Sequence, residues 1–224
     1  MSHNFLIRNS LRGAITTRAS RYLKGRLIDV GCGTKQYEGC LGEGITEHLG
    51  LDRMESPHGL QKVDLIGTAY DIPVEDNSFD SILCTEVLEH LEEPSRALTE
   101  CRRALKPGGY ALFTSPFIWH LHEEPRDFYR YSEHGLRYLF ETNDFEVVEI
   151  TPLNGFWATF GQLLVYKLYS YNRWPIRLTP LIPAMGFLIQ HVAIFLNRIF
   201  PQDIWPSHYV SVVRKPERQE STAK

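Results

Sequence analysis

Short apolar segments alternate with amphipathic ones through the first 150 residues of the chain. The apolar segments have the length of strands and lie at residues 27–30, 49–51, 79–84, 110–114 and 145–150. Residues 94–105 instead repeat apolar side chains at helical spacing and stop at Lys106-Pro107-Gly108-Gly109, where proline ends a helix and glycine permits a reversal. This alternation over residues 26–152 predicts an α/β fold with a doubly wound, parallel sheet and helices on both faces.

The first predicted strand runs directly into a glycine turn, Asp29-Val30-Gly31-Cys32-Gly33. Glycine at such a turn lets a nucleotide-like cofactor approach the main chain, although short glycine turns occur in every α/β protein. Residues 49–52 then close a second strand on Asp52, about 20 residues further on, where a carboxylate can accept hydrogen bonds from both ribose hydroxyls. The alternative for Asp52 is a solvated carboxylate at a strand end.

A third signal is Asp71-Ile72-Pro73. We expect Asp71 to accept a hydrogen bond from the exocyclic amine of an adenine and Ile72 to cover the ring face. A dinucleotide-binding dehydrogenase is the natural rival, but Gln36 stands where its fingerprint requires a third glycine.

With these motifs in order, the chain resembles the class I S-adenosylmethionine-dependent methyltransferases of the small-molecule, type 11-like branch. The matching segments are the glycine turn, Asp52, Asp71-Ile72-Pro73, Ser78-Phe79-Asp80, Val87-Leu88-Glu89-His90 and Leu105-Lys106-Pro107-Gly108-Gly109. The resemblance implies a Rossmann-like, mostly parallel seven-stranded sheet whose last strand is antiparallel. It also implies S-adenosylmethionine as cofactor, with Gly31 and Gly33 against the methionine portion, Asp29 beneath it, Asp52 on the ribose, and Asp71 and Ile72 on the adenine.

The loop after residues 110–114 is rich in histidines, acids, arginines and aromatic residues. It follows the carboxyl end of a predicted strand, and ligands of open parallel sheets lie outside the carboxyl ends of the strands. Methyl transfer to a hydroxyl or amine needs a positioned nucleophile and removal of a proton. We take His122 as the base, with Asp127 or Glu123 orienting it. Alternatively, Asp127 and Arg130 form a structural pair that holds the loop. A metal site is not expected, because alternating histidines on a loop are poor evidence for one.

The run from His122 to Tyr131 is similar to one in bacterial methyltransferases associated with cell-surface polysaccharide and glycolipid assembly. This narrower likeness implies a sugar- or lipid-linked acceptor. The predicted reaction is transfer of a methyl group to an oxygen, or less favourably a nitrogen, of a small-molecule, sugar or lipid-linked acceptor. The competing hypothesis is a non-catalytic, cofactor-binding scaffold of a membrane-associated biosynthetic complex.

Some fifty residues before a final predicted strand at 208–213 are strongly apolar and are not required by the fold. The stretch 180–200 approaches the length of a membrane span, but Pro183, Gln190 and His191 interrupt it, so we do not expect a true span. Two interpretations stay open. The segment is a helical lid or dimer surface, or it lies in a lipid interface with Lys167, Arg173 and Arg177 at anionic head groups.

Charge along the chain is uneven. Residues 1–28 carry six Lys or Arg and no acid, residues 29–149 carry ten Lys or Arg against 24 acids, and residues 150–202 carry four Lys or Arg and no acid. The acidic cofactor region disfavours nucleic acid as a substrate, and the basic flanks could add to attraction by a membrane surface. Four cysteines without Cys-x-x-Cys spacing are expected to be packed in a reducing compartment.

We therefore divide the chain into a basic helical segment (1–25), a cofactor-binding Rossmann-like domain (26–152), an apolar helical insertion (153–205), a final strand (206–214) and a flexible tail (215–224). No signal peptide is expected, since no sufficiently long apolar stretch precedes the first arginines. The expected location is the cytoplasm, at the inner face of the membrane if the insertion binds lipid. A homodimer through the insertion is the alternative.

Overall fold

The computed structural model describes residues 4–171 and 181–217. Its strands are β1 (Gly25–Val30), β2 (Ile45–Asp52), β3 (Leu65–Ile66), β4 (Phe79–Thr85), β5 (Leu105–Pro116), β6 (Glu146–Leu153) and β7 (His208–Arg214). Its α-helices are α1 (Phe5–Tyr22), α2 (Pro94–Ala104), α3 (Glu133–Glu141), α4 (Phe156–Ser170) and α5 (Leu181–Ile199). Short 3-10 turns lie at Glu38–Cys40 and Leu88–His90.

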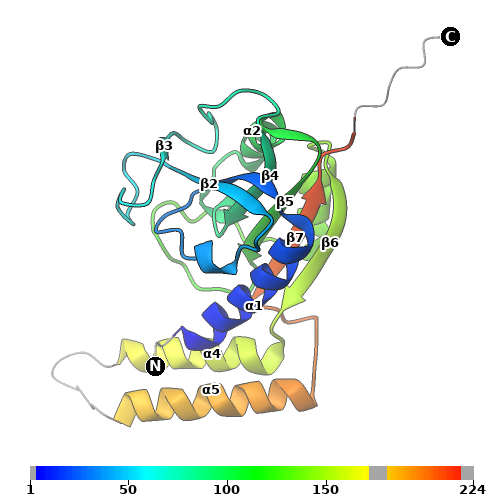
Figure 1. The fold of residues 1–224 in the computed structure, drawn as a ribbon. Helices are drawn as coiled ribbons and strands as arrows, with labels where there is room; N and C mark the ends of the chain where they lie inside the picture. Colours follow the sequence, from blue (N-terminus) through cyan, green and yellow to red (C-terminus); the bar gives the residue numbers. More distant parts are fainter. Residues whose placement is uncertain (1–3, 172–180, 218–224) are drawn as a thin grey trace.

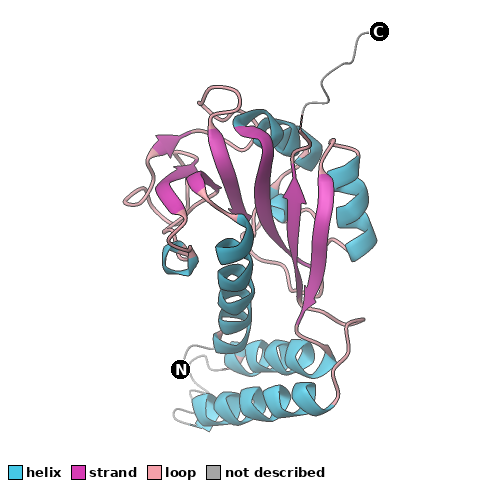
Figure 2. Ribbon diagram, turned by 45° about the vertical axis from the view of Figure 1, so that its right-hand side comes forward, coloured by secondary structure: helices cyan, strands magenta, loops and turns pink. Residues whose placement is uncertain are grey.

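The strands form one twisted sheet in the order β3-β2-β1-β4-β5-β7-β6 (Figure 2). All neighbours from β3 to β5 are parallel, whereas β7 runs antiparallel to both β5 and β6. The predicted seven-stranded, mostly parallel, Rossmann-like sheet with a helical insertion before its last strand is confirmed. Parallel strands all point their carboxyl ends to one edge, so the turns after β1, β2 and β4 meet there.

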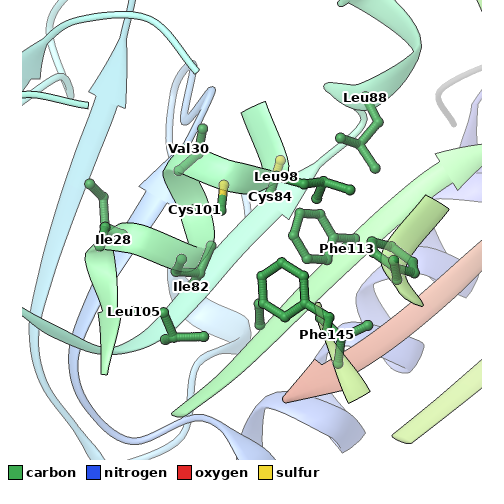
Figure 3. Packing of buried hydrophobic residues seen from close by; sticks show 14 of the residues in the cluster. Ile28, Val30, Ile82, Cys84, Leu88, Leu98, Cys101, Leu105, Phe113 and Phe145 are labelled. Carbon is green, nitrogen blue, oxygen red and sulfur yellow. The ribbon is translucent and has the colours of Figure 1, made fainter. Parts of the chain in front are cut away.

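Successive side chains of the central strands pack into two different cores, one on each face of the sheet. Ile82 of β4 and Phe113 of β5 face the core completed by α2 and α3, which Figure 3 shows from close by. Their sequence neighbours Leu83 and Leu112 face the core completed by α1, on the other side of the sheet. This two-sided burial explains why the strands read as nearly continuous apolar segments. All four cysteines are free and buried, as expected for packed residues.

The helices follow their sequence signals with one difference. Ser132 caps α3, and its hydroxyl accepts a hydrogen bond from the Gly135 backbone nitrogen at 3.1 Å. The sequence also predicts that a helical segment begins within Glu86 to Leu91, after the strand at 79–84, but the structure has only the 3-10 turn there. Glu86, directly after β4, has a positive φ, and Val87 has irregular backbone angles. These two positions prevent a regular helix between β4 and α2.

Helices α4 and α5 form the insertion between β6 and β7, and Figures 1 and 2 show them side by side at the end of the molecule away from α2. We call this pair the α4–α5 hairpin. Arg173 and Arg177, expected at lipid head groups, lie outside the described residues, as do residues 1–3 of the basic segment and 218–224 of the predicted tail.

Phe113 tests how much of the fold depends on the core between β5 and α3. Its side chain is fully buried against the ring of Phe140, with 5.1 Å between centroids. We expect Phe113→Ala to lower the free energy of unfolding by about 3–5 kcal/mol, because it removes a large apolar group and leaves a cavity. Tyr138→Ala, on the exposed side of α3, should change it by less than about 0.5 kcal/mol in the same urea titration.

Candidate active site

A cavity of about 570 Å³ opens at the carboxyl edge of the sheet, within the size range of small-ligand sites. One part of it lies against the turns after β1, β2 and β3, and is lined by Gly31, Gly33, Asp52 and Thr68, among others. The other part lies beneath the loop after β5 and between α1 and α4. The two parts are continuous, so a ligand held at the first can present an atom to a second molecule.

The glycine turn after β1 leaves main-chain atoms open to the cavity. Gly31 and Gly33 have φ of 72° and 50°, in the left-handed region that favours glycine. A Cβ built on Gly31 would lie 2.5 Å from Val87 Cγ2, and one on Gly33 would lie 3.2 Å from His58 Cδ2. A side chain at either position would therefore strain the turn and occupy the space that is open beside its main chain.

Asp52 lies at the end of β2 and lines the cavity, as the ribose assignment requires. Its Oδ2 accepts hydrogen bonds from the Gly33 nitrogen at 2.9 Å and the Ser56 hydroxyl at 3.1 Å, and its Oδ1 accepts one from the Arg53 nitrogen at 2.8 Å. The carboxylate thus ties the glycine turn to the end of β2. Oδ1 keeps a further lone pair for a ligand hydroxyl, whereas both lone pairs of Oδ2 already accept hydrogen bonds.

Asp29 is buried at the end of β1 and is not among the cavity-lining residues. Its Oδ2 lies 3.3 Å from His48 Nε2, and its other oxygen has no hydrogen-bond partner. Burial raises the pKa of Asp29 above its ordinary value, although His48 opposes the shift. A buried carboxyl group with one unpartnered oxygen beneath the glycine turn is consistent with its predicted place under the methionine portion.

Asp71 and Ile72 are not brought to the cavity, and this corrects the expectation for the adenine. Ile72 is 1% exposed and packs in the core beside α2, so its side chain cannot cover a ring in the cavity. Asp71 is exposed and does not line the cavity. Thr68, Ala69 and Tyr70 line it instead. The residues that line the cavity thus directly precede the Asp-Ile-Pro pattern.

Aromatic side chains enclose the second part of the cavity. Trp119 packs edge-on against Tyr166 of α4, with 5.3 Å between ring centroids, and against His208 of β7, with 4.9 Å. The Tyr166 hydroxyl donates a hydrogen bond to the Asn4 side chain at the start of α1. The segment before β1 and the insertion before β7 therefore both build the wall of this part of the cavity.

His122, the expected base, lines the cavity and has an acid and an arginine behind it. Its Nδ1 lies 3.4 Å from Asp127 Oδ2, and its backbone nitrogen donates to the same oxygen at 2.9 Å. Arg130 binds both oxygens of Asp127, at 2.6 and 2.7 Å. Hydrogen bonds from Arg130 hold the pKa of Asp127 well below its usual range. Asp127 therefore stays ionised, and Nδ1 of His122 faces both this carboxylate and Nη2 of Arg130, 3.5 Å away.

The environment keeps His122 itself neutral. Burial lowers the pKa of His122 below 6.5, and the neighbouring imidazole of His90, with ring centroids 4.8 Å apart, lowers it further. Asp127 opposes this shift without reversing it. Both predicted roles of Asp127, as partner of His122 and as the pair of Arg130 that holds the loop, are thus present in one arrangement.

Glu123, the other predicted partner of His122, is oriented differently. It lines the cavity, but its carboxylate oxygens lie 3.4 Å from His58 Nε2 and 4.0 Å from His90 Nε2. It therefore bridges the loop after β2 to the turn after β4. The place beside the His122 ring belongs to Asp127.

Glu86, Glu89 and His208 are site residues that the sequence analysis did not single out. Glu86 lines the cavity at a φ of 55°, and its Oε2 lies 3.1 Å from Nε2 of the buried His208. Burial alone would raise the pKa of Glu86, but His208 turns the net shift downward. Glu89 is fully buried without a hydrogen-bond partner for either oxygen, and burial with the nearby Glu86 raises its pKa well above its ordinary value. The signal was the two acids in Glu86-Val87-Leu88-Glu89-His90, directly after a buried strand.

The possible metal ligands in the structure differ from the alternating histidines of the loop. Glu89, His90 and His122 each offer an atom within 4.8 Å of the others. Asp127 is already bound by Arg130, and Glu123 by two histidines. With Glu89 protonated, this group consists of one neutral carboxyl and two imidazoles. Oε1 of Glu89 lies 3.8 Å from His90 Nε2 and 4.0 Å from His122 Nε2, which is too far for direct hydrogen bonds.

The described residues fit a nucleoside cofactor with a methionine-like tail. The glycine turn would receive the tail, Asp52 the ribose hydroxyls, and the segment Thr68–Tyr70, placed by the turn after β3, the base. His122 lies beyond this half of the cavity, beside the aromatic half. The geometry can therefore align a cofactor and an acceptor with a neutral imidazole next to them.

Part of the chain is similar in sequence to known methyltransferases. Residues 28–113 match the family model described as a methyltransferase domain. A ubiquinone biosynthesis O-methyltransferase from Dechloromonas aromatica is 35% identical over 105 residues, which cover 40% of this chain and 44% of that protein. The chain spans about half the length of the curated relatives it matches first.

Solved structures support the fold. A SAM-dependent methyltransferase from Archaeoglobus fulgidus matches with a TM-score of 0.56 and 21% identity, covering 91% of this chain and 94% of that one. The [4+2]-cyclase SpnF matches with a TM-score of 0.58 and 22% identity, covering 91% of this chain and 80% of that one. A fold shared by these two proteins does not by itself fix the reaction.

Asp52 provides a test of the cofactor half. We expect Asp52→Ala to weaken S-adenosylmethionine binding at least about tenfold, because it removes the ribose acceptor and frees the Gly33 nitrogen that it holds. Isothermal titration calorimetry measures the affinity. Glu43→Ala, which removes an exposed carboxylate outside the cavity, is the control and should bind normally. Unchanged affinity in Asp52→Ala would remove the ribose assignment.

Glu89→Gln tests whether the buried carboxyl is neutral. Because burial raises its pKa, we expect the amide to replace it with a change in unfolding free energy of less than about 1.5 kcal/mol, and added MnCl₂ should not shift the melting temperature of either protein. A melting temperature that rises with MnCl₂ in the native chain but not in Glu89→Gln would contradict this, and would instead establish a cation bound by Glu89.

Proposed function

We propose that this chain is an active, class I S-adenosylmethionine-dependent methyltransferase that methylates an oxygen of a small acceptor, and the match of residues 28–113 to the methyltransferase domain model supports this. The observation that carries the proposal is the position of His122 on the cavity wall, beside Asp127, which Arg130 holds. A base in this place is needed for a hydroxyl acceptor and would have no purpose in a protein that only stores the cofactor.

S-adenosylmethionine, when bound, supplies a methyl group on a sulfonium with a neutral thioether as leaving group. His122 then takes the proton of the acceptor hydroxyl on Nε2, while Nδ1–H donates to Asp127. Asp127 remains an anion because Arg130 binds both of its oxygens, so it stabilises the imidazolium that forms. Trp119 and Tyr166 hold the acceptor and exclude water from the reacting oxygen.

The acceptor we favour is a sugar or lipid-linked molecule, as the run from His122 to Tyr131 suggests. The aromatic walls support a ring-containing acceptor, since Trp and Tyr faces pack well on the apolar face of a ring. The relatives named for ubiquinone biosynthesis make a hydroxyl the better acceptor group than an amine. The corresponding location is the cytoplasmic face of a membrane.

The second candidate is a cofactor-binding scaffold without methyl transfer. It is favoured only by the likeness of the fold to a cyclase, which shows that this fold serves other roles. Incubation of the purified protein and methyl-labelled S-adenosylmethionine with a bacterial envelope extract separates the two. Label in the organic phase indicates a lipid-linked acceptor, label in the aqueous phase a soluble one, and no transferred label the scaffold.

His122→Ala should lower the rate of label transfer by about 10²–10⁴-fold and leave cofactor affinity nearly unchanged, since it removes a general base but no cofactor contact. His134→Ala, on α3 outside the cavity, is the matched control. Survival of full activity would place the base elsewhere or show that none is required.

The pH dependence follows from the state of His122. Its neutral form is the base, and its pKa is lowered, so the rate should be level through pH 7–8 and fall as the pH drops through a value below the ordinary imidazole pKa of about 6.5. Rates measured with saturating cofactor from pH 5 to 8 check this. An acid limb centred above 7 would contradict the assignment.

A further inference from the structure

The α4–α5 hairpin has the inverse of the usual arrangement of apolar and polar residues. The residues of α5 that are buried against the rest of the protein are Ile182, Gly186, Gln190 and Ala193. Apart from Ile182, most of the large apolar residues of the same helix are exposed, among them Phe187, Leu188 and Phe195. In water, a helix places its large apolar side chains against the core, so this pattern indicates a different surrounding.

Small and polar residues form the seam between the two helices. A Cβ on Gly161 of α4 would lie 2.6 Å from the Cβ of Ala193, so the backbones approach closely there. Gln162 is 0% and Gln190 3% exposed. Small residues that allow close approach and polar residues kept inside a helix pair are typical of helices that associate in lipid, where outward apolar groups cost nothing.

The outer surface of the hairpin is apolar along its whole length. Leu188 is 62% and Phe195 61% exposed on α5, and Trp157, Phe160 and Leu164 are exposed on α4. Within the described residues, α5 is the one helix long and apolar enough to cross a membrane, with a mean hydropathy of 1.3, and only 22% of it is buried. A core helix with this composition would be mostly covered by the protein.

Charge favours an anionic surface over a second copy of the chain. Residues 150–202 contain no acid, and the exposed charged side chains of the described hairpin are Lys167 and Arg198. Two copies packed through this face would bring like charges together, whereas anionic head groups would neutralise them. The acidic residues 29–149 would be repelled by such a surface, which orients the molecule with the hairpin toward it.

The hairpin is also part of the cavity wall. Tyr166 projects from α4 into the cavity, where its ring lies 4.7 Å from the ring of His120 and 5.3 Å from that of Trp119. The neighbouring Leu164 is half-exposed on the outer face. One turn of α4 therefore connects the apolar surface to the acceptor half of the cavity.

We propose that the α4–α5 hairpin docks on an anionic lipid bilayer, with its outer face in the interface, and that the acceptor is an amphiphile whose head group enters the cavity past Tyr166. The hairpin lies in the interface and does not cross it, because α4 has 15 residues, fewer than the about 20 that a span needs, and its Tyr166 lines the cavity. Docking is independent of the proposed methyl transfer. Only the nature of the acceptor rests on it.

Vesicle flotation tests the docking surface directly. The full chain should float with vesicles of phosphatidylglycerol and phosphatidylcholine, and less with phosphatidylcholine alone. We expect the double variant Leu188→Glu, Phe195→Glu to reduce the vesicle-bound fraction at least about tenfold, because two apolar groups leave the lipid and two acids face anionic head groups. The matched control Tyr138→Glu, Val148→Glu changes exposed apolar residues on α3 and β6 and should float normally.

Three further measurements make each outcome decisive. Cofactor affinity by calorimetry should be equal in all three proteins, which shows that they are folded. Failure of the native chain to float, or a dimer by light scattering that the Leu188→Glu, Phe195→Glu variant dissociates, would overturn the proposal. Label transfer to envelope lipids should fall in this variant when the lipids are in vesicles and recover in detergent micelles. Flotation without any label transfer would leave docking intact and reject the proposed function.

Discussion

Strand β4 is buried on both faces, and this constraint determines where the chemistry of the chain can lie. Ile82 and Cys84 pack into the core beside α2, and Leu83 into the core beside α1, so neither face has room for a charged group. The first charged residue after them, Glu86, comes only where the chain leaves the sheet. Strand β1 differs, because the buried Asp29 lies within it, directly before the glycine turn. The charged groups of β4 and of the following segment that reach the cavity lie beyond the carboxyl end of the strand.

Three carboxyl groups with little exposure lie near that edge, and each is stabilised differently. Glu86 is ionised beside His208, Asp127 is ionised between the two donors of Arg130, and Glu89 is neutral because it is buried without a partner. Ionised acids are thus each matched with a cation or an imidazole, and the unmatched acid keeps its proton. The outcome is that His122 meets one fixed anion and remains neutral itself.

Much of the fold and half of the site could be predicted from the sequence. The strands were recognisable because two-sided burial produces continuous apolar segments, and Gly31 and Asp52 because backbone conformation and hydrogen bonding demand particular residue types there. The assignment of Asp71 and Ile72 to the adenine did not match the cavity, because a sequence motif identifies a segment, whereas the packing of the folded chain decides that Ile72 points into the core. His208 could not be found, since its partner Glu86 lies over a hundred residues away and only the position of β7 between β5 and β6 brings them together.

The place of β7 in the sheet also has a consequence for how the chain is synthesised. Strand β6 pairs with β7 and not with β5, so both β5 and β6 keep an unpaired edge until the last strand has emerged from the ribosome. The α4–α5 hairpin emerges before that strand. Its apolar surface is therefore available to a bilayer or a chaperone while the sheet is still open, and the sheet is completed only when β7 joins it. His208, the first residue of that strand, completes the cavity at the same moment.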